Sequence, residues 1–157
     1  MLKVEFVAEP GKQEIVVTCT LDAPRERVFK MYTDPALTAQ WWGPKIYTNT
    51  IEKMELQPGG LWRIIQRDAK GNTYGFHGIY HAIVFPERIV RTFEYEGAPG
   101  HVLLETLTLN ALGDRTQLKN QSVFQSVADR DAMLAENCES VSTESMNNLA
   151  ELLAKVG

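Results

Sequence analysis

The first strongly patterned stretch of the chain is rich in β-branched residues. Residues 13–21 read QEIVVTCTL, and Ile, Val and Thr suit the pleated surface of a strand. Two short helices are predicted after it, because Asp22 is followed by Ala23-Pro24 and Asp34 by Pro35, and either aspartate can cap the start of a helix that has proline in its first turn. The first helix runs to about Thr33, and the second ends before Gly43-Pro44.

After Pro44 the pattern changes to short apolar runs separated by turn residues, which is typical of strands. Turn signals such as Pro58-Gly59-Gly60 divide these runs from one another. Six more strands are predicted, at residues 47–56, 61–67, 74–85, 88–95, 101–110 and 116–124. Because the connections are short, we predict one antiparallel sheet of six or seven strands. Residues 1–12 are expected to form a loose extension.

The last segment, from about Ala128 to Lys155, predicts one long amphipathic helix. Its apolar residues recur at spacings of three, four and seven: Met133, Leu134, Val141, Met146, Leu149, Leu152 and Leu153. It is the only predicted element large enough to cover one face of the sheet. The pattern therefore indicates a single α+β domain over residues 1–157, in which a curved sheet wraps around the C-terminal helix. Because a twisted sheet curls, we also predict a cavity between the two.

Composition narrows the classes of partner. The chain has 157 residues, of which 44% are hydrophobic and 23% charged, which is ordinary for a globular protein. A net charge of −4 argues against a nucleic-acid partner, since that affinity comes from clustered Lys and Arg. No apolar run approaches the ~20 residues of a membrane span, and the N-terminus lacks a signal-peptide core, so we expect a cytoplasmic protein.

The sequence gives no pattern for a metal ion or another cofactor. Cys19 and Cys138 lie far apart and are expected to be free thiols. His77 and His81 would lie roughly 13 Å apart along a strand, so they cannot share a metal ion. No GxSxG, P-loop, dinucleotide-binding or HExxH motif occurs. We therefore expect neither a metal nor a cofactor.

One motif carries a resemblance to a known family. Residues 33–44 read TDPALTAQWWGP, and LQPGGLW at 56–62, GIY at 78–80 and PERIV at 86–90 follow in order. These segments resemble proteins related to the C-terminal domain of the activator of heat-shock protein 90 ATPase. The resemblance covers nearly the whole chain from about Val16. It implies the START-like, helix-grip fold, whose members include co-chaperone domains and proteins that bind or sequester hydrophobic metabolites.

The same resemblance marks one departure in the last helix. Members often carry a Gly-Trp pair there, and Val141-Ser142 stands at the equivalent place. Because a large indole is missing, the volume of the pocket is expected to differ from that of relatives.

Alternation along strands selects candidate cavity walls. Alternate residues share a face, which groups Trp62 with Ile64 and Gln66, Phe76 with Gly78, Tyr80 and Ala82, and Leu118 with Asn120, Ser122 and Phe124. Plain core packing is the alternative, especially for Ile64 and Phe76. Asn120 and Ser122 would be polar anchors if their face is inward, and solvated if it is outward. The predicted ligand contacts are Trp41, Trp42, Trp62, Ile64, Gln66, Phe76, Tyr80, Leu118, Asn120, Ser122, Phe124 and Val141.

Two neighbouring tryptophans stand at the end of the second predicted short helix. Trp41 and Trp42 could stack on a ligand or hold the short helices to the sheet, and only one of these neighbours is expected to face the cavity.

Arg91 and Glu105 lie on central strands and would be candidates for proton transfer or carboxylate capture if they faced inward. The general exposure of charged residues instead favours the solvated face.

Three functions remain open. The favoured one is binding of a small hydrophobic or aromatic molecule, because the sequence shows no catalytic constellation. A co-chaperone-like interaction module would instead present an exposed apolar or charged patch. An enzyme, such as a cyclase, dehydratase or hydrolase acting on a polyketide-like compound, would need at least two titratable groups inside the pocket. A homodimer through the short helices or a sheet edge is a further expectation.

Overall fold

The computed structural model describes residues 2–155, and within them it has eight strands and four helices. The strands are β1 (Val4–Val7), β2 (Glu14–Leu21), β3 (Thr48–Met54), β4 (Leu61–Arg67), β5 (Thr73–Val84), β6 (Arg88–Tyr95), β7 (Val102–Leu112) and β8 (Arg115–Phe124). The helices are α1 (Arg25–Thr33), α2 (Pro35–Trp41), α3 (Val127–Ala135) and α4 (Cys138–Lys155). All the strands join one antiparallel sheet in the order β1-β2-β8-β7-β6-β5-β4-β3.

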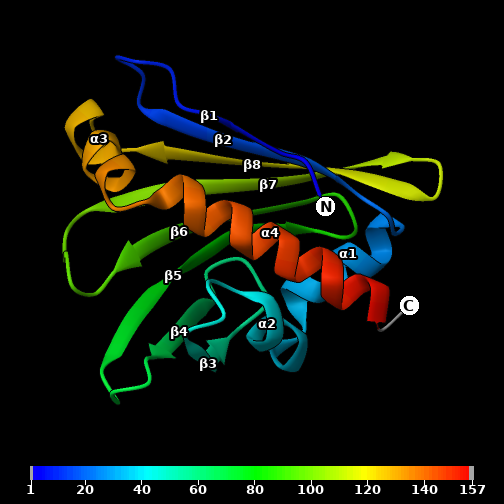
Figure 1. Ribbon diagram of the computed structural model, residues 1–157, viewed down its shortest axis with the longest axis horizontal. Helices are drawn as coiled ribbons and strands as arrows, with labels where there is room; N and C mark the ends of the chain where they lie inside the picture. The colour runs from blue at the N-terminus through cyan, green and yellow to red at the C-terminus, as the bar shows by residue number, and fades with distance from the viewer. Residues whose placement is uncertain (1, 156–157) are drawn as a thin grey trace.

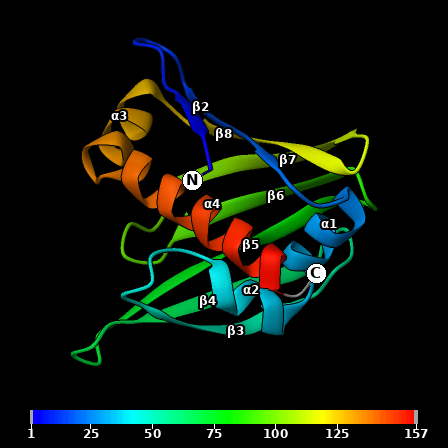
Figure 2. The same ribbon diagram turned by 45° about the vertical axis from the view of Figure 1, so that its right-hand side comes forward.

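The helices lie against one face of this sheet. Figure 1 shows α4 crossing that face, with α1 and α2 beside its C-terminal half and α3 packed near β8 at the other end. The turned view in Figure 2 shows the sheet curving around α4. We call the face that α4 covers the inner face. The predicted α+β class and helix-grip arrangement are confirmed, with one strand more than expected. No helix within residues 2–155 combines the length and hydropathy that crossing a membrane requires.

The N-terminal residues are more ordered than expected. Val4–Val7 pairs with β2 from Val4 opposite Cys19 to Val7 opposite Val16, so the prediction of a loose extension is wrong for these residues. The sequence VEFV alternates, and Val4 and Phe6 pack against the core while Glu5 is exposed. An apolar residue at every second position is enough to hold a short edge strand.

The predicted single C-terminal helix is two helices. α3 ends at Ala135 and α4 starts at Cys138, and Asn137 between them has a φ of 60°. Asparagine tolerates this left-handed conformation better than most residues, which allows the chain to turn there. Ser126 begins α3 by accepting a hydrogen bond from the backbone N–H of Asp129.

One of the two predicted helix caps is present. Asp34 Oδ1 accepts hydrogen bonds from the backbone N–H groups of Ala36 and Leu37, and α2 begins at Pro35 as predicted. The predicted cap at Asp22 is wrong, because α1 begins after Pro24 without a side-chain cap and the Asp22 side chain is 94% exposed.

A bulge changes which residues of β5 face inward. Tyr80 pairs with Arg91, but Ala82 pairs with Val90, so the register shifts between them. An extra residue in one strand moves the following side chains to the other face. Ile83 then packs against the core opposite the buried Ile89. The prediction that Ala82 shares a face with Tyr80 is therefore wrong.

Candidate functional site

Four polar or charged side chains form a row across the inner face. Tyr80 of β5 pairs with Arg91 of β6, Arg91 with Glu105 of β7, and Glu105 with Ser122 of β8. Residues directly opposite one another in antiparallel strands project from the same face and lie close together. We call Tyr80, Arg91, Glu105 and Ser122 the inner polar row.

The centre of the row is an ion pair. Arg91 Nε donates a hydrogen bond of 2.9 Å to Oε1 of Glu105, and the two side chains are only 16% and 17% exposed. The guanidinium carbon of Arg91 lies 3.9 Å from the centre of the Trp62 ring, so the cation also stacks on an aromatic face. Burial opposes the charge on Arg91, but the Glu105 carboxylate and Tyr80 outweigh burial and raise the pKa of Arg91.

The expectation that Arg91 and Glu105 lie on the solvated face is wrong. The alternation of each strand contained the signal that places them inward. Ile89 and Phe93 stand two residues before and after Arg91, so they lie on the same face of β6 as Arg91. Leu103 and Leu107 stand in the same relation to Glu105 on β7. Ile89, Leu103 and Leu107 are buried. An apolar face on both sides of a charged residue is a stronger indicator of direction than the average exposure of charged residues.

Two tyrosines keep their protons near this pair. Tyr80 is 1% exposed, and its hydroxyl makes no hydrogen bond of normal geometry within the described residues. Burial raises the pKa of Tyr80, although the Arg91 charge lowers it in part. Burial, followed by Cys19 and Glu105, raises the pKa of Tyr32 of α1 well above its ordinary value. Both hydroxyls are therefore hydrogen-bond donors at neutral pH, and that of Tyr80 has no acceptor among residues 2–155.

An aromatic cluster surrounds one side of the row. Its members are Trp42, Trp62, Phe76, Phe93 and Tyr95. Ring centres lie 5.2 Å apart for Trp42 and Phe76, 5.7 Å for Trp62 and Phe93, and 5.1 Å for Phe76 and Tyr95. Phe93, Tyr95 and Tyr32 were not among the predicted contacts, although the alternation of residues 88–95 also indicates that Phe93 and Tyr95 face inward.

The two neighbouring tryptophans lie in different surroundings, and only Trp42 packs on the inner face of the sheet. Trp41 is 3% exposed and donates from Nε1 to the carbonyl oxygen of Met31, which holds α2 against α1. Trp42 is partly buried and packs on Phe76 of the inner face. The next residue, Gly43, donates to Ser145 and accepts from Asn148, so the same loop is fastened to α4.

The remaining predicted contacts occupy different surroundings. Ile64, Leu118 and Phe124 are buried in the core, and Gln66 is buried against Gly43 instead of beside the row. Asn120 pairs with Leu107 and is partly buried, so it faces inward. Val141 is 39% exposed on α4, and the structure does not bring it together with the others.

The middle of the inner face is less tightly buried than its margins. Arg91, Phe93, Glu105, Asn120 and Ser122 all keep part of their surface exposed, whereas Trp62, Tyr80 and Leu118 keep 1% or less. Partial exposure therefore extends along the inner polar row from Ser122 through Glu105 to Arg91, directly beside the covered Tyr80.

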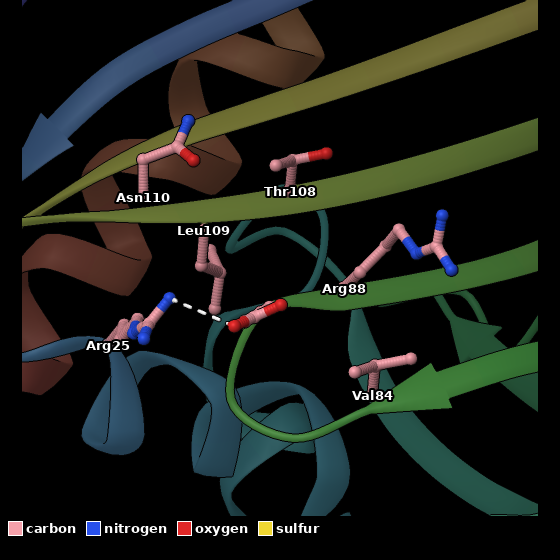
Figure 3. Close-up of a pocket in the computed structure, with 7 residues that line it drawn as sticks. Arg25, Val84, Arg88, Thr108, Leu109 and Asn110 are labelled. Carbon is pink, nitrogen blue, oxygen red and sulfur yellow. Dashed lines mark ion pairs between the residues drawn. The ribbon is translucent and has the colours of Figure 1, made fainter.

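Two hollows lie away from the row. The first, of about 380 Å³, lies between the start of α1 and the strands β5 to β7. Arg25 and Glu87 approach to 3.8 Å there (Figure 3). The second, of about 290 Å³, lies on the outer face around Arg63 and His77. Of the predicted ligand contacts, only Trp62 lines either hollow.

Charged residues on the outer face pair with one another. Arg63 contacts both oxygens of Glu96, at 2.7 and 2.8 Å, and also Glu52 at 2.7 Å. His77 Nδ1 lies 2.8 Å from Glu96, so this histidine belongs to the same network. Within residues 2–155 no group of three or more His, Cys, Asp or Glu side chains is arranged to hold a metal ion.

The fold and the row define a helix-grip protein with a buried ion pair on its inner face. The chain belongs to the family described as Activator of Hsp90 ATPase homolog 1-like protein, whose model matches residues 22–154. Among curated proteins, none matches the sequence.

Solved structures share the fold. A protein from Arthrobacter aurescens is 22% identical with a TM-score of 0.89, and the match covers 96% of this chain and 91% of that one. A protein from Rhodobacter sphaeroides is 24% identical with a TM-score of 0.88, over 98% and 99% of the two chains. DynU16, a protein in the dynemicin biosynthetic locus, is 17% identical with a TM-score of 0.72, over 91% of this chain and 48% of that one.

Proposed function

We propose that the protein binds a small, mostly apolar or aromatic molecule between its sheet and α4, with one polar group of the ligand directed at the inner polar row. The observation that carries this proposal is the buried Tyr80 hydroxyl, which has no acceptor in the described part of the chain and lies next to the Arg91–Glu105 pair on a largely apolar face. Ligand sites of this kind have apolar walls and a few polar groups that fix orientation. The aromatic cluster supplies such walls.

The ionisation of these groups favours binding over catalysis. An enzyme would need at least two titratable groups at the site, and the row contains them. However, the pKa values of Tyr80, Tyr32 and Arg91 are all raised, so these groups retain their protons at neutral pH. A general acid or base works best with a pKa near the operating pH. Tyr80, Tyr32 and Arg91 are therefore better suited to donating hydrogen bonds to a ligand than to exchanging protons with it.

A thermal-melting screen against neutral aromatic and aliphatic compounds tests the proposal. A ligand that binds only the folded protein adds about 2.7 kcal/mol of stability at a hundred times its Kd, so a binder raises Tm clearly. For each binder, amide chemical shifts in a titration should change for residues of β5 to β8 around the row.

A matched pair of variants locates the site. Phe93→Leu changes the wall beside the row and should weaken binding severalfold, whereas Ile79→Leu on the outer face should leave the Kd unchanged. Failure of every compound to raise Tm, or equal effects of the two variants, would contradict the proposal.

A protein-interaction role has one observation in its favour. Leu61 pairs with Ile79 across β4 and β5, Leu104 pairs with Val123 across β7 and β8, and all four are 37–41% exposed on the outer face. A partner docking on this outer apolar stripe would shift the amides of these residues instead of those near the row, so the same titration separates the two functions. The expected cytoplasmic location and homodimer stay predictions.

A further inference from the structure

The inner polar row contains one full charge of each sign. Arg91 and Glu105 are the charged groups that act on the pKa of Tyr80, and the same two act on Tyr32 together with the thiol of Cys19. Arg91 and Glu105 are hydrogen-bonded to each other, so their charges compensate. The row therefore has strong local dipoles and no net charge.

The groups of the row that are still free to hydrogen-bond near Tyr80 and Arg91 are donors. Within the described residues, Arg91 donates from Nε to Glu105 while one face of its guanidinium group covers Trp62. Its terminal N–H groups and the Tyr80 hydroxyl are donors. A buried donor without an acceptor lowers stability, and a ligand that supplies the acceptor recovers that energy. The row thus calls for an acceptor at its Tyr80 end.

The charge of that acceptor is restricted by Glu105. A carboxylate placed against Tyr80 and Arg91 would lie close to the Glu105 carboxylate in a largely buried site, where repulsion between like charges is weakly screened. It would also lose its hydration without a free cation to replace it, because Arg91 is already paired. A ketone, ester or amide oxygen accepts the same hydrogen bonds and has neither cost.

We propose that the inner polar row selects neutral ligands that carry a carbonyl acceptor on an aromatic body, and rejects the corresponding carboxylates. This specificity rests on the binding function proposed above. The aromatic body lies against Phe76, Phe93 and Trp42, and the carbonyl oxygen accepts from Tyr80 and the terminal N–H groups of Arg91.

Methyl naphthoate and naphthoate form the matched probe pair, because they share a ring system and differ in charge. Their Kd values for the full chain are measured by titration at neutral pH. We expect the ester to bind at least about tenfold more tightly than the carboxylate, since the carboxylate alone meets Glu105. Tyr80→Phe should weaken ester binding about tenfold, because it removes one hydrogen bond to the carbonyl group.

A charge variant reverses the preference. Glu105→Gln leaves Arg91 uncompensated, so naphthoate should bind at least about tenfold more tightly than it does to the original chain. Glu151→Gln removes a carboxylate from the exposed Lys45–Glu151 pair and serves as the control, with both Kd values unchanged. If Glu105→Gln does not fold, the double variant Arg91→Gln/Glu105→Gln replaces it. The double variant should still prefer the ester, since it offers no cation to the carboxylate.

The outcomes separate the two proposals. If naphthoate binds the original chain as tightly as the ester does, the selectivity for neutral ligands is wrong while binding at the inner face stands. An unchanged naphthoate Kd in a folded Glu105→Gln variant would also overturn the selectivity. If neither probe nor any compound of the melting screen binds, the binding function itself fails.

Discussion

Gly78 determines the position of Trp62 on the inner face. The indole of Trp62 lies across Gly78 and donates from Nε1 to the carbonyl oxygen of Thr92 at 3.0 Å. A Cβ atom at residue 78 would overlap both that oxygen and the indole nitrogen. Trp62 in turn supports the guanidinium group of Arg91. The geometry of the row therefore requires glycine at residue 78.

Gly78→Ala is therefore expected to lower the free energy of unfolding by about 2 kcal/mol, because the added methyl group has no space. Urea unfolding measures this change, and the amide and indole spectrum should show a displaced Trp62 N–H. Gly71→Ala is the control, since nothing lies near its Cβ position and only its positive φ of 87° adds a cost of about 1 kcal/mol. An equal cost for both variants with an unmoved Trp62 signal would contradict the steric explanation.

The direction of individual side chains could be predicted only in part. Trp62, Tyr80, Asn120 and Ser122 were assigned to shared faces by alternation, and the registers agree. The bulge after Tyr80 could not be predicted, because one inserted residue leaves no compositional mark and still reverses the parity of Ala82. The unpaired state of the Tyr80 hydroxyl depends on neighbours from other strands, which no local pattern contains.

At the scale of elements, the two aspartates before α1 and α2 look alike in sequence and differ in structure. Asp34 accepts two backbone hydrogen bonds, whereas Asp22 is exposed and caps nothing. The spacing explains the difference: Asp34 directly precedes its proline, but Ala23 stands between Asp22 and Pro24. Pro24 therefore occupies the cap position of α1, and the aspartate lies too far back.

Asp34→Ala should lower the free energy of unfolding by about 1 kcal/mol, because two N–H groups of α2 lose their acceptor. Asp22→Ala should change it by no more than about 0.5 kcal/mol, since the side chain is on the surface. Chemical denaturation of the two variants side by side provides the measurement. Equal losses would show that Asp34 does not act as the cap.

Helices and strands were largely predictable, and the exceptions have local causes. β4 and β6 have the predicted bounds, since turn residues stand at both ends of each strand. The break between α3 and α4 was missed because the apolar spacing continues through it, while the turn depends on one residue, Asn137. β1 was missed because four residues are too few for a clear pattern.

At the scale of the whole molecule, one surface network links the pH of the solution to stability. Arg63 of β4 binds Glu52 of β3 and Glu96 beyond the end of β6. The hydrogen bond from Arg63, together with His77, lowers the pKa of Glu96 from 4.5 to about 2. Because the pKa is lower in the folded state, the stabilising contribution is complete above pH 4.5 and is lost as the pH falls towards 2.

The expected contribution is about 1 kcal/mol, since solvent screens a partly exposed pair. Stability of the original chain and of Glu96→Gln, measured by urea unfolding across this acid range, should converge as the pH falls. Curves that stay parallel from pH 4.5 to 2 would show that Glu96 does not carry the effect.

The inner polar row exists only in the folded molecule, because the pairing of strands brings its residues together. Its four members are separated by 11, 14 and 17 positions in the chain, and register alone brings them together. The sequence could predict a sheet around a helix, and the family resemblance supported that fold. It could not predict which residues of neighbouring strands stand opposite one another.

The inner polar row takes one side chain from each of four successive strands, and this arrangement has an evolutionary consequence. A substitution at any one position changes the chemistry offered to a ligand, while buried residues two positions away in the strands, such as Ile89 and Leu107, preserve the core. The chemistry of the row can therefore change one strand at a time without a change of fold. Solved structures that are 22–24% identical to the chain share its architecture.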